Sequence, residues 1–188
     1  VFGSDDHLFA KAVFFYDDVK DFIAPKAWLE PTTPPTLYYS SQNVGHVVRK
    51  GIELSGTYAA GQFSTSVSYG LLHAVDKETN ERMNGITPQS ANLKLAYAFP
   101  AQAINVWYRA HWSKGGESSV EDRATGKKLH FSSFLTHSLG AEWSPKVADL
   151  ANLQAGIAAV NLFDKEYRML NGSYGSGRGV RLWLSAQF

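Results

Sequence analysis

The feature that most constrains this chain is the alternation of apolar and polar side chains over its last residues. Every second position is apolar: Val180, Leu182, Leu184, Ala186 and Phe188. The positions between them hold Arg181, Trp183, Ser185 and Gln187. Successive side chains of a β-strand point to opposite faces, so this period of two predicts a strand with one apolar face. The same period recurs along the chain and predicts an all-β fold.

About eight such strands are predicted, each roughly 9–16 residues long, which is the length of a tilted membrane-spanning strand plus some overhang. They cover residues 8–23, 46–58, 63–73, 90–99, 104–112, 134–143, 153–163 and 179–188. No segment reaches the roughly 20 apolar residues of a membrane helix. We therefore expect a transmembrane antiparallel β-barrel, with the apolar face of each strand toward lipid.

The connections between these strands alternate in length, as in bacterial outer-membrane barrels. Residues 58–63 and 99–104 are tight turns, and residues 143–153 are somewhat longer. The long connections are residues 24–45, 74–89, 113–133 and 164–178, which we expect on the outside, the first as a stiff proline-rich loop. Aromatic residues on the apolar faces beside the short turns predict a girdle at the membrane–water interface: Tyr58, Phe63, Phe99, Trp143 and Phe188.

Composition excludes several classes of function. The chain has 18 basic and 17 acidic residues, a formal net charge of +1, so it has no basic excess with which to bind nucleic acid. Cysteine is absent, which excludes disulfides and thiolate metal sites. The chain begins Val-Phe-Gly, without an initiator Met or a signal peptide. We expect a processed chain or a piece of a longer polypeptide.

Inward positions bear on the size of the barrel. Eight strands can close alone, but the interior is then filled by side chains. Many inward positions here are small or polar: Ser64, Ser66, Ser68, Gly70, Gly140, Gln154, Gly156 and Ala158. These positions suit a wide lumen, and they favour the interpretation that this chain is part of a larger barrel. The alternative is a complete small eight-stranded barrel acting as an adhesin, an anchor or a lipid-modifying enzyme.

Three blocks carry a resemblance to a known family. The seventh strand ends in Val160-Asn161-Leu162-Phe163-Asp164-Lys165-Glu166-Tyr167, and Gly175-Ser-Gly-Arg-Gly179 precedes the last strand. Residues 49–54 read Arg-Lys-Gly-Ile-Glu-Leu, and residues 19–23 read Val-Lys-Asp-Phe-Ile. Together these resemble the C-terminal end of TonB-dependent outer-membrane receptors. Within that family, residues 20–23, 86–88 and 163–167 are most similar to receptors for haem or haemoproteins.

The resemblance implies a role in transport and no catalysis. It implies that residues 1–188 are the C-terminal segment of a barrel of about 22 strands, closed by a plug domain that this chain lacks. The implied location is the bacterial outer membrane, and the implied cargo is haem or another iron carrier. The implied partners are outer-membrane lipid, the rest of the receptor with its plug, the TonB complex through the missing N-terminal part, and a haemophore or haemoprotein at the long loops. No cofactor is expected to bind this chain alone, and the resemblance implies haem only as a possible transported ligand.

Five residues are candidates for ligand binding. Trp107, Arg109 and His111 share the inner face of one strand and could meet a planar anionic ligand by stacking and ion pairing. His73 and His130, like His111, fall near the outer strand ends or in a long loop, where imidazole could bind haem iron. The ordinary alternatives are lumen-lining residues and solvated loop histidines.

One group of residues on the sixth predicted strand has the composition of a catalytic site. His137, Ser138 and Glu142 have the residue types of a serine hydrolase. Adjacent residues of a strand point to opposite faces, so His137 and Ser138 cannot meet on one wall. We predict no catalytic residue and no metal site.

Overall fold

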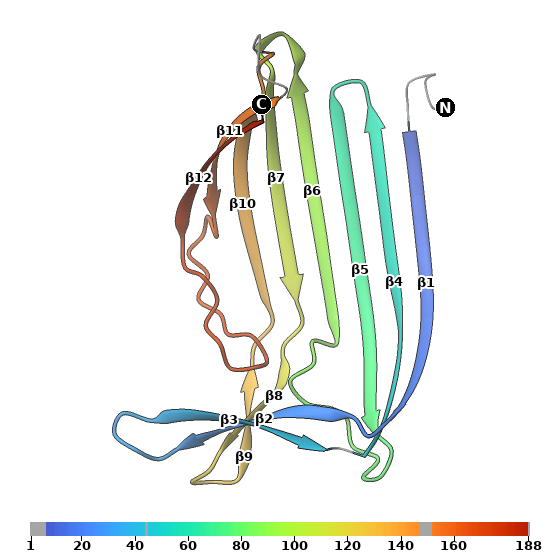
Figure 1. Ribbon diagram of the computed structural model, residues 1–188, viewed down its shortest axis with the longest axis vertical. Helices are drawn as coiled ribbons and strands as arrows, with labels where there is room; N and C mark the ends of the chain where they lie inside the picture. The colour runs from blue at the N-terminus through green and yellow to red at the C-terminus, as the bar shows by residue number, and fades with distance from the viewer. Residues whose placement is uncertain (1–6, 44, 147–151, 188) are drawn as a thin grey trace.

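The computed structural model describes residues 7–43, 45–146 and 152–187, which form two β-sheets (Figure 1). The larger sheet is an eight-stranded wall in the order β1-β4-β5-β6-β7-β10-β11-β12, and every neighbouring pair is antiparallel. Its strands are β1 (His7–Lys20), β4 (His46–Ala60), β5 (Phe63–Asp76), β6 (Gln89–Phe99), β7 (Ile104–Ser113), β10 (Phe134–Trp143), β11 (Asn152–Val160) and β12 (Gly179–Gln187). The eight predicted strands are confirmed.

The smaller sheet was not predicted. It contains β2 (Ile23–Glu30), β3 (Thr36–Asn43), β8 (Gly116–Asp122) and β9 (Lys127–Phe131), in the order β3-β2-β8-β9. The strands come from residues 24–45 and 113–133, which we expected to be loops, and Pro25 lies inside β2 opposite Ser41. This expectation was wrong because the sheet depends on the parallel pairing of β2 with β8, which local patterns cannot show.

Strand ends also differ from the prediction in two places. The first strand does not continue to Ile23, because Asp21 takes a positive φ of 55° and the chain then enters the second sheet as β2. The seventh strand stops at Val160 instead of Phe163, because Asn161 has a φ of 49°. In both places one residue takes the left-handed backbone conformation, which L-amino acids other than Asn and Asp rarely adopt. This residue turns the chain away from the wall.

The two faces of the wall divide as the alternation predicts. On the predicted outward face, Phe14 is 74% exposed and Leu182 and Leu184 are each 75% exposed. Phe63, Phe99 and Trp143, beside the short turns, are also exposed on this face. The other two predicted girdle aromatics are Tyr58 and Phe188, and Phe188 lies outside the described residues. A continuous exposed apolar face suits a hydrocarbon solvent.

Short and long connections lie at opposite ends of the wall (Figure 1). The tight turns are at the end where the chain starts and stops, and one of them contains the 3₁₀ turn η1 (Pro100–Gln102). The smaller sheet lies across the other end, with residues 77–88 and 161–178 beside it. Within the described residues, no helix is long and apolar enough to cross a membrane.

Several glycines of the inner face lie beneath aromatic rings. Gly140 is paired with Trp107, and a Cβ atom added to it would overlap the indole ring. Gly156 relates to Trp183 in the same way, and Gly51 to Phe15. Gly140 and Gly156, two of the small positions that suggested a wide lumen, are therefore covered by tryptophan.

Candidate functional site

The inner wall has its most buried cluster around Trp107, which is 8% exposed. Ala96, Trp107, Gly140, Ala158 and Arg181 are paired one to the next across β6, β7, β10, β11 and β12. Ala96 and Ala158 pack against the indole, and Trp183 packs against the edge of this cluster. The small residues of the row leave room for the two tryptophan rings to lie against the wall.

Arg109 lies beside this cluster, with its guanidinium carbon 5.3 Å from the centroid of the Trp107 ring. The Arg109 side chain itself is exposed. The predicted Trp107–Arg109 pair therefore exists, but the indole is buried and offers no open face for a ligand to stack on. Arg109 is the member of the pair that remains accessible from the lumen.

A cavity of about 360 Å³ lies over this part of the inner wall. Its lining includes Trp107, Arg109, Arg181 and Trp183. Polar groups complete it: Thr136, Ser138, Asn161, Tyr167 and Ser176. Arg181 and Trp183 were assigned to the inner face by alternation but were not predicted as site residues, because their closeness to Arg109 depends on the order of the strands.

His111 lies on the same inner face, nearer the loop end. Its Nδ1 atom is 2.7 Å from Oδ1 of Asn92, and the Asn92 amide donates to the Ser68 hydroxyl at 3.1 Å. The ring also lies 5.8 Å from that of Phe134, which stacks on Tyr167 at 4.1 Å. His111 thus belongs to a polar row across β5, β6 and β7.

His73 lies on the opposite face from these residues. It is exposed, directly opposite Lys50, and has the same parity along β5 as the outward Tyr69 and Leu71. The structure therefore does not bring His73 together with Trp107, Arg109 and His111. The period of two in the sequence already contained this signal, because residues 69, 71 and 73 share one face.

His130 is on β9 in the smaller sheet, away from the wall cluster. It is exposed and contributes to the lining of two cavities of about 600 and 620 Å³ at the loop end. Arg168, Tyr167 and Tyr174 line the first, and Met83, Lys128 and Leu170 are among those that line the second. Of the three predicted histidines, His130 is the one that lies in the smaller sheet at the loop end.

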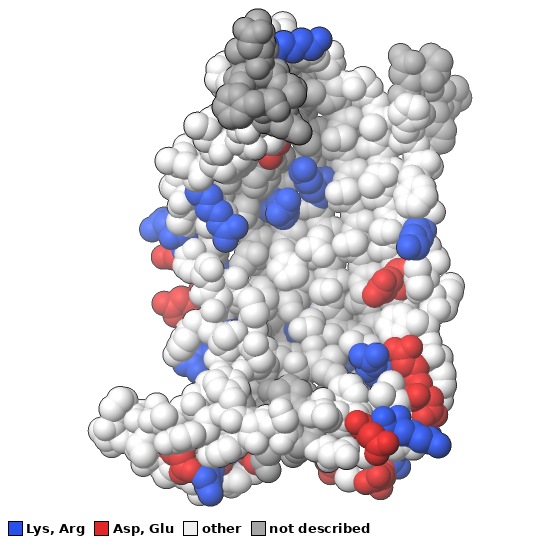
Figure 2. Space-filling view, viewed as in Figure 1, with Lys and Arg blue, Asp and Glu red and all other residues white. Residues whose placement is uncertain are grey.

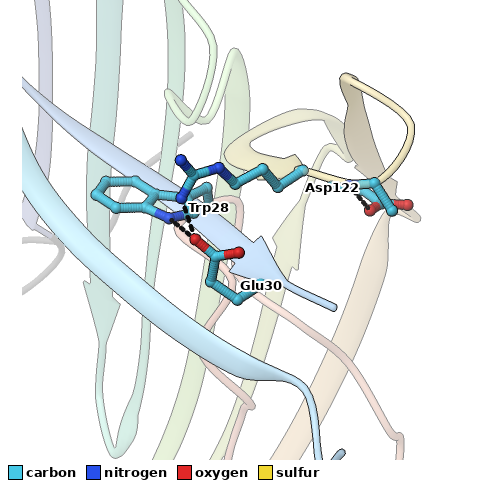
Figure 3. Close-up of polar contacts among 5 residues, drawn as sticks. Trp28, Glu30 and Asp122 are labelled. Carbon is cyan, nitrogen blue, oxygen red and sulfur yellow. Dashed lines mark hydrogen bonds and ion pairs between the residues drawn. The ribbon is translucent and has the colours of Figure 1, made fainter. Parts of the chain in front are cut away.

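Polar contacts fix the geometry of the smaller sheet (Figure 3). The Trp28 indole donates to Glu30 at 3.2 Å, and Arg123 forms an ion pair with the same carboxylate. Asp122 accepts from the Ala124 backbone N–H at 3.0 Å and from the Thr125 hydroxyl at 2.9 Å, which closes the β8–β9 turn. Of these contacts, the Arg123–Glu30 ion pair joins segments that are far apart in the sequence, and the others are local.

The block from Val160 to Tyr167 has a structural role that the sequence did not reveal. The Asn161 side chain, 5% exposed, donates to the carbonyl groups of Lys165 and Ser176 at 2.9 and 3.0 Å. Its Oδ1 atom accepts from the Lys165 N–H at 2.9 Å, and Asp164 accepts from the Arg178 N–H at 2.8 Å. Together they set the start and end of the last long loop.

In a comparison with known families, residues 2–162 match a family model described as "TonB dependent receptor-like, beta-barrel". Among curated proteins, two Heme/hemopexin utilization protein C sequences of Haemophilus influenzae are each 24% identical over 97% of this chain. The chain spans about a quarter of their length, 26% and 27%.

Solved structures share the fold. The copper transporter OprC superposes with a TM-score of 0.69 at 18% identity, covering 97% of this chain and 28% of its own. The FrpB iron transporter from Neisseria meningitidis gives 0.67 at 20% identity, covering 93% and 27%. The pyoverdine receptor FpvA from Pseudomonas aeruginosa gives 0.65 at 18% identity, covering 96% and 27%. All three match this chain with about a quarter of a much larger protein.

Proposed function

The chain belongs to the TonB-dependent receptor-like β-barrel family of the bacterial outer membrane, and from that membership we propose that it is part of a receptor for haem or another iron carrier. The family consists of transporters and not enzymes, so no bond-making chemistry is assigned to the wall. We propose that residues 1–188 form the C-terminal segment of the barrel and that the plug domain is supplied by another part of the receptor.

The observation that carries this proposal is the open eight-stranded sheet. β1 pairs only with β4, and β12 only with β11, among the described residues. An exposed strand edge inside a membrane leaves backbone groups without partners, so barrels close completely. Pairing of β1 with β12 would have favoured the small complete barrel; two open edges instead favour additional strands between them.

The choice of haem is supported by the relatives named for haem utilisation, which align with nearly the whole chain. We propose that a haem or a haem-carrying protein makes its first contact at the loop end, where His130 lines two cavities. The remaining proposed partners are outer-membrane lipid on the apolar face, the plug domain in the lumen, and the TonB complex.

Growth assays on the complete receptor test this function. Deleting its gene in the source bacterium should abolish growth when haem is the only iron source, and the intact gene should restore it. Ferric pyoverdine and copper serve as comparison cargoes because structural relatives carry those names. Unchanged growth on haem with lost growth on another iron carrier would overturn the choice of haem. Unchanged uptake of every cargo would overturn the receptor proposal.

A further inference from the structure

Two arginines on the inner wall point to a ligand site of their own. Arg109 and Arg181 both line the 360 Å³ cavity above Trp107 and Trp183. Their strands are separated by β10 and β11, three spacings or about 14 Å of wall. Gly140 and Ala158, the positions between Trp107 and Arg181 in the cross-strand row, are small, and Ser138 is paired with Arg109, so no large side chain of β10 or β11 separates the two arginines there.

Within the described part of the chain, neither Arg109 nor Arg181 forms an ion pair with an acidic residue. The ion pairs within residues 7–43, 45–146 and 152–187 are His46–Asp18, Arg49–Asp17 and Arg123–Glu30. Arg49 lies on the same inner face and binds Asp17 at 3.0 Å, so the wall does pair a lumen arginine where an acid is near. Lys94, directly opposite Arg109, adds a third positive charge.

The charges around the cavity also bear on whether Arg109 and Arg181 are neutralised by acidic residues. Figure 2 shows Lys and Arg atoms at mid-height on the wall together with a few Asp and Glu atoms toward its sides, and a larger group of Asp and Glu atoms mixed with basic ones near the loop end. Glu142, the acidic residue of β10, lies two residues from Gly140 toward the short turns and accepts from the Gln154 amide at 3.5 Å. The cavity therefore has an uncompensated positive lining.

We propose that Arg109 and Arg181 bind a carboxylate-bearing group in the barrel lumen. A guanidinium presents a planar fork of N–H donors that matches a carboxylate in a bidentate contact. The Trp107 ring beneath Arg109 fixes one face of its guanidinium and leaves the N–H edge free. The hydroxyl groups of Thr136, Ser138 and Ser176 supply further donors around the same cavity.

The carboxylate has two possible sources: an acidic side chain of the domain that fills the lumen, or a free carboxylate of a passing ligand. This inference rests on the proposed receptor function, because that function makes this face a lumen. Both sources would present a carboxylate to the two arginines. They differ in the property that is lost when the arginines are replaced: binding of the ligand, or retention of the domain in the lumen.

The test uses the complete receptor in detergent with Arg109→Gln and Arg181→Gln combined, and Lys50→Gln, an exposed cation of the outward face, as the matched control. Binding is measured by tryptophan fluorescence with haem, whose two carboxylates are free, and with haem dimethyl ester. A ligand source predicts at least about a tenfold weaker binding of haem, equal to about 1.4 kcal/mol, with unchanged binding of the ester. If the carboxylate belongs to the lumen domain, the double variant should instead release that domain at a lower urea concentration. Protease cleavage of the released domain measures this.

Either result supports the site, and identical behaviour of the double variant and the Lys50 control in both assays would overturn it. Retained mobility of the folded barrel on unheated gels identifies variants that fold. If the unmodified receptor binds neither haem nor its ester, the haem proposal fails while the urea assay still decides the arginine site.

Discussion

The indole ring of Trp183 lies over Gly156, the residue directly opposite it on β11, so closely that a Cβ atom at Gly156 would overlap the ring. Trp107 and Gly140 repeat this arrangement between β7 and β10. A glycine in a strand usually weakens it, but here each glycine makes space for a large ring to lie against the wall. The rings add buried apolar contact without projecting into the lumen.

Gly140→Ala should therefore destabilise the barrel by about 1–3 kcal/mol, because the added methyl group displaces Trp107. Gly70→Ala is the matched control, since a Cβ there would lie 3.6 Å from the Ser90 hydroxyl, an ordinary contact. Urea unfolding followed by tryptophan fluorescence measures both. Equal midpoints for the two variants would contradict the close packing at Gly140.

Leu95→Arg should cost about 2–4 kcal/mol, because Leu95 faces lipid near the middle of β6. Ser64→Arg is the comparison: Ser64 is exposed on the lumen face, opposite Ala96. We expect much less destabilisation there because the charge stays in water. Unfolding in lipid vesicles checks the difference, and equal losses would reverse the assigned facing.

Asn161→Ala should loosen the last long loop without disturbing β6 or β7. It removes three hydrogen bonds of roughly 1 kcal/mol each and places alanine at a φ of 49°. Hydrogen exchange should rise in residues 161–178 alone. Asn161→Gly removes the backbone strain at this φ but does not restore the three side-chain hydrogen bonds, so it should show the same increase in loop exchange. Protection equal to that of the wild type would refute the role of the side chain.

Ser118→Ala should weaken the smaller sheet more than Glu30→Gln does. Ser118 is fully buried, and its hydroxyl donates to the Leu170 carbonyl at 2.5 Å and accepts from the Val120 N–H at 3.0 Å. Removing such a buried group costs about 1–3 kcal/mol, whereas an ion pair as exposed as Arg123–Glu30 contributes about 0–1 kcal/mol. Protease cleavage rates within residues 113–133 compare the two, and faster cleavage of the Glu30 variant would invert this ranking.

The period of two was sufficient to predict the wall, because every membrane strand must separate an apolar face from a polar one. It also put Arg109 and His111 on the lumen face and contained the signal that places His73 on the other. It could not predict the smaller sheet, where Pro25 and many charged residues obscure any alternation. Residues 115–126, which lie within the predicted loop 113–133, include all of β8 and the buried Ser118 and Val120.

The candidate site was predictable only in part for a related reason. Trp107 and Arg109 are neighbours on one strand, so local spacing joins them. Arg181 is 72 positions beyond Arg109 in the numbering and reaches the same cavity only through the order β7-β10-β11-β12. The orientation of the Trp107 ring, which buries it, depends on a glycine across the strand pair.

The parallel pairing of β2 with β8 also sets an order of events during biogenesis. Arg123 and Glu30 are 93 residues apart, and β4, β5, β6 and β7 all lie between them in the chain. Contacts of such long range form late because the intervening chain must first be ordered. We therefore expect the β2–β8 pairing of the smaller sheet to form after those four strands lie side by side. Protection of Val120 from hydrogen exchange would then report the completion of the barrel wall.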